Sequence, residues 1–181
     1  PTKTPEEGYH FTEDIADQSI DWIKQQKALM PDKPFYINRA PGATHAPHHV
    51  GDEWSNNYSG RFDAGWDALR EETLARQKET GVVPQDAVLT ERHDGIPAWD
   101  DVDDDLKPVL ARQMEIYAGF LEHTDHELGR IVDTLDELGV LDDTIIYYII
   151  GDNGASAEGS IQGCFNEYTF INGRADVETT E

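Results

Sequence analysis

An acidic side chain and an amide side chain stand next to each other at the end of an apolar run. Asp152 and Asn153 follow "TIIYYII", residues 144–150, and lie between Gly151 and Gly154. A carboxylate oxygen and an amide oxygen are hard ligands of the kind that Ca²⁺ and Mg²⁺ prefer. The same letters are also typical of an Asp-Asn-Gly turn. The pattern therefore predicts either a divalent-cation site or a simple turn.

Histidines gather in a second segment, "THAPHH", residues 44–49, which carries three of the seven histidines. His45 and His48 could donate to an anionic substrate or bind a metal ion, because imidazole does both. A zinc site would need further His or Cys ligands at a recognisable spacing, and the sequence shows no convincing set. Solvated loop histidines are the alternative interpretation.

Three other groups favour structural interpretations. His123 and His126 are three residues apart in a predicted helix and share a face, so they indicate a solvated helix surface or a support for a neighbouring loop. The acidic run "DDVDDD", residues 100–105, lacks the glycine and the final Glu of a calcium-binding loop. Cys164 has no flanking base and is interpreted as a structural thiol.

Two predicted strands would position the candidate site residues. "PFYINRA", residues 34–40, is short, rich in aromatic and branched residues and bounded by prolines, and the histidine segment follows it. Residues 144–150 show no polar alternation, which is typical of a strand buried on both faces. Open α/β sheets place their ligand sites at the carboxyl ends of strands, where Asp152 and Asn153 would lie.

Three predicted helices accompany these strands. The first spans residues 12–30, with the Thr12 hydroxyl as its cap and acidic residues in its first turn. The second closes at Gly81, and the third closes at Gly139. The third carries a long amphipathic stripe of apolar residues, namely Leu106, Val109, Leu110, Met114, Tyr117, Leu121, Leu128, Val132 and Leu135. The order helix, strand, helices, strand predicts an α/β fold.

Composition limits the possible partners. The chain has 181 residues, 38% of them hydrophobic, and a formal net charge of −23. That charge excludes the phosphate attraction on which nucleic-acid binding depends. No apolar stretch approaches the ~20 residues of a membrane span. Because the chain starts at Pro1 and ends in a polar stretch without a closing element, we expect a fragment of a longer protein.

Four segments resemble the bacterial arylsulfatases of the type I sulfatase family, within the alkaline-phosphatase-like superfamily. They read "PFYINRAPGATHAPHHV", "GRFDAGWDALREETLARQKETGVVP", "IPAWD" and "ARQMEIYAGFLEHTDHELGRIVDTLDELGVLDDTIIYYIIGDNGASAEG". The likeness runs from about residue 10 to residue 167. Arg39 departs from the pattern, since relatives usually carry an aromatic or small apolar residue there.

The resemblance implies roles for three residues. Asp152 and Asn153 would be half of a Ca²⁺ site, with Mg²⁺ as the other candidate ion, and His45 would bind the sulfate and act beside the scissile oxygen. In the family, a formylglycine made from Cys or Ser in a C/S-x-P/A-x-R motif supplies the nucleophile. That motif does not occur in these 181 residues, because Cys164 is followed by Phe-Asn-Glu-Tyr.

The resemblance also implies a fold and an activity. The fold would be an α/β mixed sheet sandwiched by helices, of which residues 1–181 would form the central part of the catalytic domain, without its N-terminal nucleophile segment and C-terminal part. The activity would be hydrolysis of a small-molecule sulfate ester, and many relatives are periplasmic or secreted. The alternatives are a phosphodiesterase or phosphatase of the same superfamily, which would typically show Asp-His instead of Asp-Asn, and a non-catalytic acidic metal-binding module.

Overall fold

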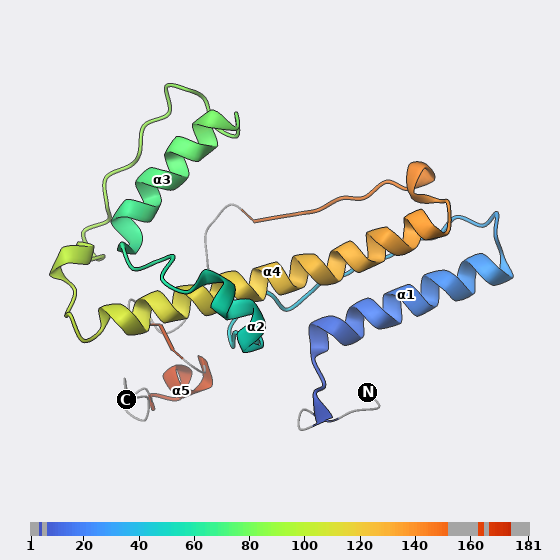
Figure 1. Cartoon of the computed structure of the whole chain (residues 1–181), viewed down its shortest axis with the longest axis horizontal. Helices are drawn as coiled ribbons and strands as arrows, with labels where there is room; N and C mark the ends of the chain where they lie inside the picture. Colours follow the sequence, from blue (N-terminus) through green and yellow to red (C-terminus); the bar gives the residue numbers. More distant parts are fainter. Residues whose placement is uncertain (1–3, 5–6, 152–162, 165–166, 175–181) are drawn as a thin grey trace. The chain divides into compact units, whose positions relative to one another are not determined.

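The chain forms two compact units in the computed structural model. The structure describes residues 4, 7–151, 163–164 and 167–174 (Figure 1). Unit 1 comprises Pro1–His45 with Phe120–Ser156, and unit 2 comprises Ala46–Gly119 with Ala157–Glu181. Among the described residues, none of the helices has the length and apolar character needed to cross a membrane.

Helix α1, Phe11–Leu29, opens unit 1 and confirms the first predicted helix to within one residue. Its cap is different from the predicted one. His10 is extended, and its Nδ1 accepts a hydrogen bond from the Thr12 backbone N–H at 3.3 Å. Thr12 lies inside the helix and is buried, so its hydroxyl is not the cap. Glu13 and Asp14 lie in the first turn, as predicted, where negative charge suits the helix dipole.

Helix α4, Lys107–Glu137, is the long predicted helix. It ends as expected, because Gly139 has a φ of +66° and the Val140 N–H donates to the Leu135 carbonyl at 3.0 Å. This six-residue return bond is the Schellman arrangement, which satisfies carbonyls left free at a helix end. A 3₁₀ turn, η4, follows at Leu141–Asp143.

The core of unit 1 lies where α1 packs on the second half of α4. Ala16 and Ile23 of α1 are fully buried, and they form one cluster with Ile131 and Leu135 of α4. Half-buried apolar side chains complete the cluster, namely Ile20, Phe35, Ile37, Leu128, Val140 and Leu141. Apolar burial of this kind is what holds two amphipathic helices together.

Residues 34–40 are extended and lie against this core. Phe35, Ile37 and Arg39 are half-buried, whereas Tyr36 is 84% exposed. The alternation has the two-residue period of a strand with one face packed. Within the described ranges no β-ladder includes the segment, however, so the structure describes an extended chain where a strand was predicted.

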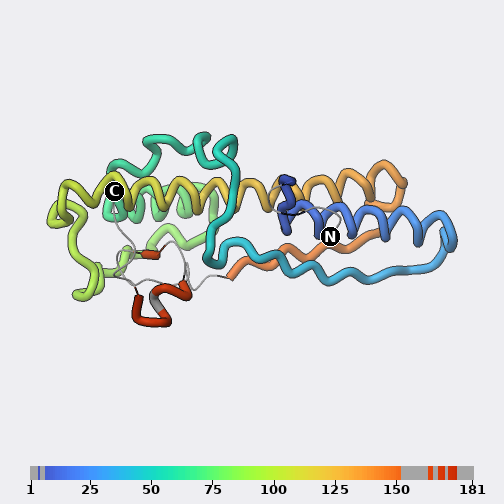
Figure 2. The backbone as a smooth tube through the Cα atoms, turned by 90° about the horizontal axis from the view of Figure 1, so that it is seen from below, coloured from blue at the N-terminus to red at the C-terminus, as the bar shows by residue number. Residues whose placement is uncertain are grey.

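Residues 144–150 differ more strongly from the prediction of a doubly buried strand. They are extended, and Figure 2 shows them on the same side of the α1 and α4 pair as residues 34–40. Their side chains are largely exposed, with Ile149 at 90% and Tyr147 at 82%. Nothing in the described part of the chain pairs with this segment in a ladder, so the predicted sheet is not confirmed. A strand requires a hydrogen-bonded neighbour, and here the described residues offer none.

Unit 2 is built around the first half of α4. The short helices α2, Asp52–Ser55, and η2, Asn56–Tyr58, approach α4 at Gly119. A Cβ at Gly119 would lie 2.7 Å from the Ser55 backbone N and Cα, so only glycine permits this distance. Arg112 and Glu115 fix the same loop, because Arg112 donates to Ser55 Oγ at 2.9 Å and Glu115 accepts from the Gly60 N–H at 2.7 Å.

Helix α3, Gly65–Glu79, is the second predicted helix and ends, as predicted, at Gly81 with a φ of +75°. Its first turn packs on the 3₁₀ turn η3, Trp99–Asp101. The rings of Trp66 and Trp99 meet edge to face at 4.7 Å, and Asp67 accepts from the Trp99 N–H at 2.9 Å. The last described helix of unit 2 is α5, Glu167–Ile171.

Candidate functional site

His45 lies at the exposed end of the extended segment that begins near residue 34. Its backbone N–H donates to the Gly42 carbonyl at 2.9 Å, which fixes a tight turn before the histidine segment. The side chain is solvent-exposed and therefore accessible to a small molecule. Its assignment as the sulfate-binding and catalytic histidine stays a prediction.

The other two histidines of the segment belong to unit 2. His48 is half-buried, and its ring meets the Tyr117 ring of α4 edge to face at a centroid distance of 5.3 Å. His49 is exposed, and its backbone N–H donates to the Pro47 carbonyl at 3.0 Å. His48 therefore has a packing role, and His49 is a suitable control for experiments on His45.

The predicted cation ligands, Asp152 and Asn153, lie outside the described residues. The structure follows the apolar segment as far as Gly151, which is exposed. The proposal that a divalent ion binds there thus rests on the oxygen donors that these two side chains supply.

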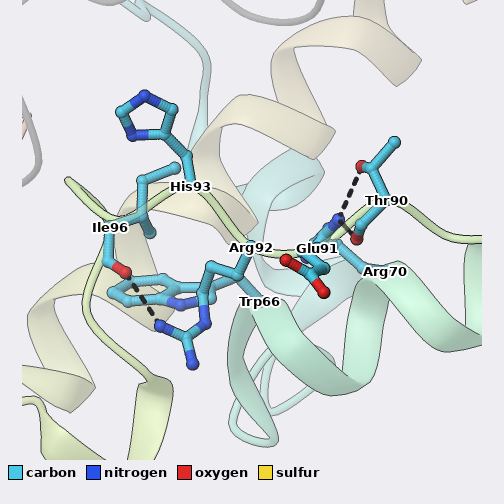
Figure 3. A pocket seen from close by; sticks show the side chains of 7 residues that line it. All are labelled: Trp66, Arg70, Thr90, Glu91, Arg92, His93 and Ile96. Carbon is cyan, nitrogen blue, oxygen red and sulfur yellow. Dashed lines mark hydrogen bonds between the residues drawn. The ribbon is translucent and has the colours of Figure 1, made fainter.

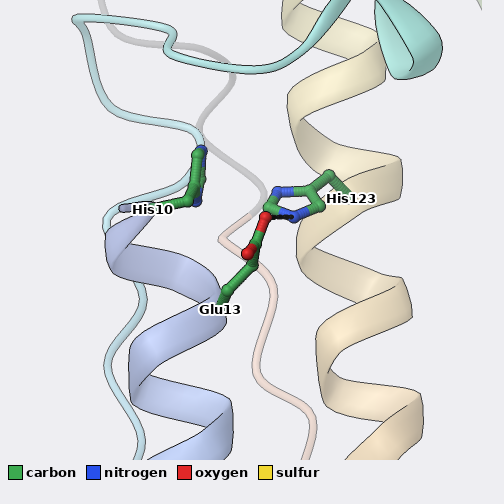
Figure 4. A group of neighbouring side chains, drawn as sticks. All are labelled: His10, Glu13 and His123. Carbon is green, nitrogen blue, oxygen red and sulfur yellow. Dashed lines mark ion pairs between the residues drawn. The ribbon is translucent and has the colours of Figure 1, made fainter. Parts of the chain in front are cut away.

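A separate cluster of possible metal ligands lies within unit 1 (Figure 4). It consists of His10 and Glu13, from the start of α1, and His123, from α4. One ligand atom from each residue lies within 4.8 Å of the others. His123 Nε2 is 3.4 Å from Glu13 Oε1, and the His10 and His123 rings meet edge to face at a centroid distance of 4.5 Å.

His123 is the buried member of this cluster, at 2% exposure. Burial lowers the pKa of its imidazole, and neighbouring His10 lowers it further, against the opposing influence of Glu127 and Glu13. The ring is therefore neutral at neutral pH, the state in which imidazole has a lone pair to share. His126, one turn further along α4, is exposed, so the two histidines predicted to share a solvated face have different surroundings.

No sequence motif indicates this cluster. His10 and Glu13 are more than a hundred residues from His123, and a short ligand-spacing motif connects residues only within one segment. His10 caps α1 in place of Thr12. In this position the His10 ring lies next to His123 of α4.

Arg39 lies close to the same region of unit 1. Its Nη2 donates to the Thr12 carbonyl at 3.4 Å, and its buried Nε has no hydrogen-bond partner in the part of the chain that the structure describes. Burial lowers the pKa of the guanidinium, and the negative charge of Glu127 opposes this effect. Arg39 thus places a half-buried cation next to the start of α1.

Unit 2 contains a cavity of about 270 Å³ next to α3 (Figure 3). Its lining consists of Trp66, Arg70, Thr90, Glu91, Arg92, His93 and Ile96. The two arginines are engaged by the protein, since Arg70 donates to the Thr90 carbonyl at 2.7 Å and Arg92 to the Ile96 carbonyl at 2.9 Å. Arg92 also pairs with Asp67 at 3.1 Å. These bonds hold residues 90–96 on α3, and no predicted site residue lines the cavity.

Comparison with known proteins identifies the relatives of this chain. A profile of the family described as Sulfatase matches residues 1–176. An uncharacterized sulfatase of Schizosaccharomyces pombe is 34% identical over 149 residues, which is 81% of this chain and 26% of that protein. An arylsulfatase of Klebsiella aerogenes is 26% identical, over 89% of this chain and 33% of the enzyme.

A third relative, an arylsulfatase of Clostridium perfringens, is also 26% identical, over 82% of this chain and 27% of that protein. The chain thus spans about a quarter to a third of the length of these curated relatives. The profile match extends over almost every residue, and the yeast protein aligns with four fifths of the chain. The chain therefore belongs to the sulfatase family.

Proposed function

We propose that these 181 residues form the central part of the catalytic domain of an arylsulfatase-like sulfuric ester hydrolase. The observation that carries the proposal is the family match over residues 1–176. Two of the three relatives named above are called arylsulfatases, and this supports an aromatic ester as the substrate class. In the complete protein, we expect the extended segments 34–40 and 144–150 to become strands of the mixed sheet typical of alkaline-phosphatase-like enzymes.

His45 would act on the leaving group. An exposed imidazole at the end of an extended segment can donate a hydrogen bond to the ester oxygen, where negative charge develops as the S–O bond breaks. Proton donation at that atom makes an aryl alcohol the leaving group instead of a phenolate. The exposure of His45 supports this role, because a small ester can reach the side chain.

Asp152 and Asn153 would hold Ca²⁺. The donor set fits, since both side chains offer the hard oxygens that this ion binds. The His10, Glu13 and His123 cluster does not fit Ca²⁺, because two of its three donors are imidazole nitrogens. When bound, a divalent ion offsets negative charge on sulfuryl oxygens. The chain has a net charge of −23 and few cationic side chains, so the ion would supply positive charge that the protein itself lacks.

The nucleophile would come from another part of the complete protein. A formylglycine requires a C/S-x-P/A-x-R motif, and Cys164 lacks it because Asn166 stands at the Pro or Ala position and Tyr168 at the Arg position. Cys164 is half-buried and is not a candidate for this modification.

The complete protein should hydrolyse an aryl sulfate such as 4-nitrophenyl sulfate much faster than the matching phosphate mono- and diesters. His45→Ala should lower kcat/KM by roughly ten- to a thousandfold, the cost of losing one proton donor or charge-assisted hydrogen bond. His49→Ala is the matched control from the same segment and should cost much less. Faster turnover of the phosphate diester would support the phosphodiesterase alternative, and a larger effect of His49→Ala would overturn the assignment of His45.

A further inference from the structure

We propose that His10, Glu13 and His123 bind one divalent transition-metal ion, for which Zn²⁺ is the best fit. The three residues lie within unit 1, and they bring together the start of α1 and the middle of α4. The site differs from the proposed Asp152 and Asn153 site in donor chemistry and in the ion that it selects. The ion would link two helices whose sequences lie more than a hundred residues apart.

The distances suit a tetrahedral ion. With Zn–N and Zn–O bonds of ~2.0–2.1 Å, two ligand atoms of a tetrahedral site lie about 3.3 Å apart. His123 Nε2 and Glu13 Oε1 are separated by 3.4 Å, which is close to that edge. An N–H···O hydrogen bond is usually shorter, at about 2.9 Å. The third ligand atom, from the half-buried His10, already lies within 4.8 Å of both, so a short movement of this ring would complete the set.

The donor set is selective. Two imidazole nitrogens and one carboxylate oxygen are ligands that Zn²⁺ takes in sites with three protein ligands and one water. Ca²⁺ and Mg²⁺ prefer oxygen ligands, so they should compete weakly at this site. Glu13 supplies the negative charge that partly neutralises the ion, and it is the most exposed of the three.

The protein already positions two of the ligands without the ion. His123 is buried on α4, so its ring cannot rotate freely. Glu13 lies in the first turn of α1. His10 caps that helix through a hydrogen bond of 3.3 Å, which is long for this type of bond.

Metal titration of the 181-residue chain tests the proposal. After chelator treatment, Zn²⁺ should bind in isothermal titration with one ion per chain at this site. Co²⁺ should give the visible absorption bands of a four-coordinate ion, and Zn²⁺ should abolish them. Glu13→Gln keeps the shape of the side chain without its charge, and His10→Asn keeps a good helix cap without the imidazole. Each variant should weaken Zn²⁺ binding by more than about tenfold, since even residues that only support a ligand cost that much.

Three control variants separate this site from other metal-binding groups. His126→Gln changes a histidine that lies on the same helix but outside the cluster. The double variant His48→Ala/His49→Ala removes two loop imidazoles. Asp152→Ala removes the proposed Ca²⁺ ligand. All three should bind Zn²⁺ as the unmodified chain does. Undiminished affinity in Glu13→Gln and His10→Asn overturns the proposal, as does loss of the Co²⁺ bands in the loop double variant. Circular dichroism of each variant shows that the helices remain formed.

Discussion

His123 and His126 illustrate how much the position of one residue on a helix matters. They are three residues apart on α4, yet His123 is 2% exposed beneath the start of α1 while His126 faces solvent. Three residues along a helix leave two side chains about 60° apart around its axis, enough to place one in the interface and one at its edge. The chemistry available to each ring follows from that difference, since the buried His123 lies next to a second imidazole and a carboxylate.

At Asp152, the expected effect of substitution is on metal affinity. In the complete protein, Asp152→Ala should weaken Ca²⁺ binding by roughly tenfold or more, because it removes the only anionic ligand that this chain is proposed to supply. Isothermal titration of the two proteins measures the difference, with Asp142→Ala, an exposed acid in η4, as the control. Equal Ca²⁺ affinities for Asp152→Ala and the unmodified protein would remove Asp152 from the site.

The candidate site could be predicted only where its signal is local. The Gly-Asp-Asn-Gly sequence and the histidine segment each stand within a few residues, so both could be proposed from the sequence, and their roles stay predictions. The cluster of His10, Glu13 and His123 depends on how α1 packs against α4, and on His10 replacing Thr12 as the helix cap. Neither feature is encoded in the spacing of the three residues, so the sequence favoured a structural interpretation of His123.

The helices show the clearest agreement between sequence and structure. Their periodic apolar residues and closing glycines, such as Gly81 and Gly139, act within one or two turns, so both bounds of α1 and the C-terminal ends of α3 and α4 could be predicted. Extended segments need partners far away in the sequence. Residues 34–40 keep the alternation of a strand, and residues 144–150 keep its extended backbone, but neither forms a ladder among the described residues.

Gly119 offers a test of how α2 packs on α4. A Cβ there would lie 2.7 Å from the Ser55 backbone, so Gly119→Ala should lower the free energy of unfolding by about 1–3 kcal/mol through overpacking. Gly129→Ala on the same helix is the matched control, because a Cβ there meets nothing within 4 Å. Alanine is the better helix former, so the control should be stabilised by up to about 1 kcal/mol. Urea denaturation of both variants gives the comparison, and equal stability would contradict the close approach.

The net charge of the chain and its exposed apolar segment have opposite effects on solubility. Its net charge of −23 favours solubility through mutual repulsion between molecules. The apolar side chains of residues 145–150 act in the opposite direction, since all six are exposed, from 45% at Ile146 to 90% at Ile149. An exposed apolar segment with a free edge is a site for association with another strand. In a complete sulfatase, we expect the remaining sheet to cover this segment.

The 181-residue chain alone should not hydrolyse an aryl sulfate above background, even with Ca²⁺ supplied. It has no formylglycine motif, and correct positioning of a substrate cannot replace the group that attacks sulfur. A chromogenic aryl sulfate assayed across a Ca²⁺ series measures this, with Asp152→Ala as the control. Robust turnover that the substitution abolishes would show that the chain contains a complete site.

The extended segment at residues 145–150 also provides a reporter of assembly. No backbone hydrogen bond among the described residues involves these six amides, so deuterium from the solvent should replace their protons quickly. The amides of α4 near Ile131 and Leu135 lie in the buried core and should exchange far more slowly. If a neighbouring strand pairs with the segment in the complete enzyme, its amides will become protected as well. The exchange rate of six amides would then show whether the catalytic sheet has formed, without a substrate and without an activity assay.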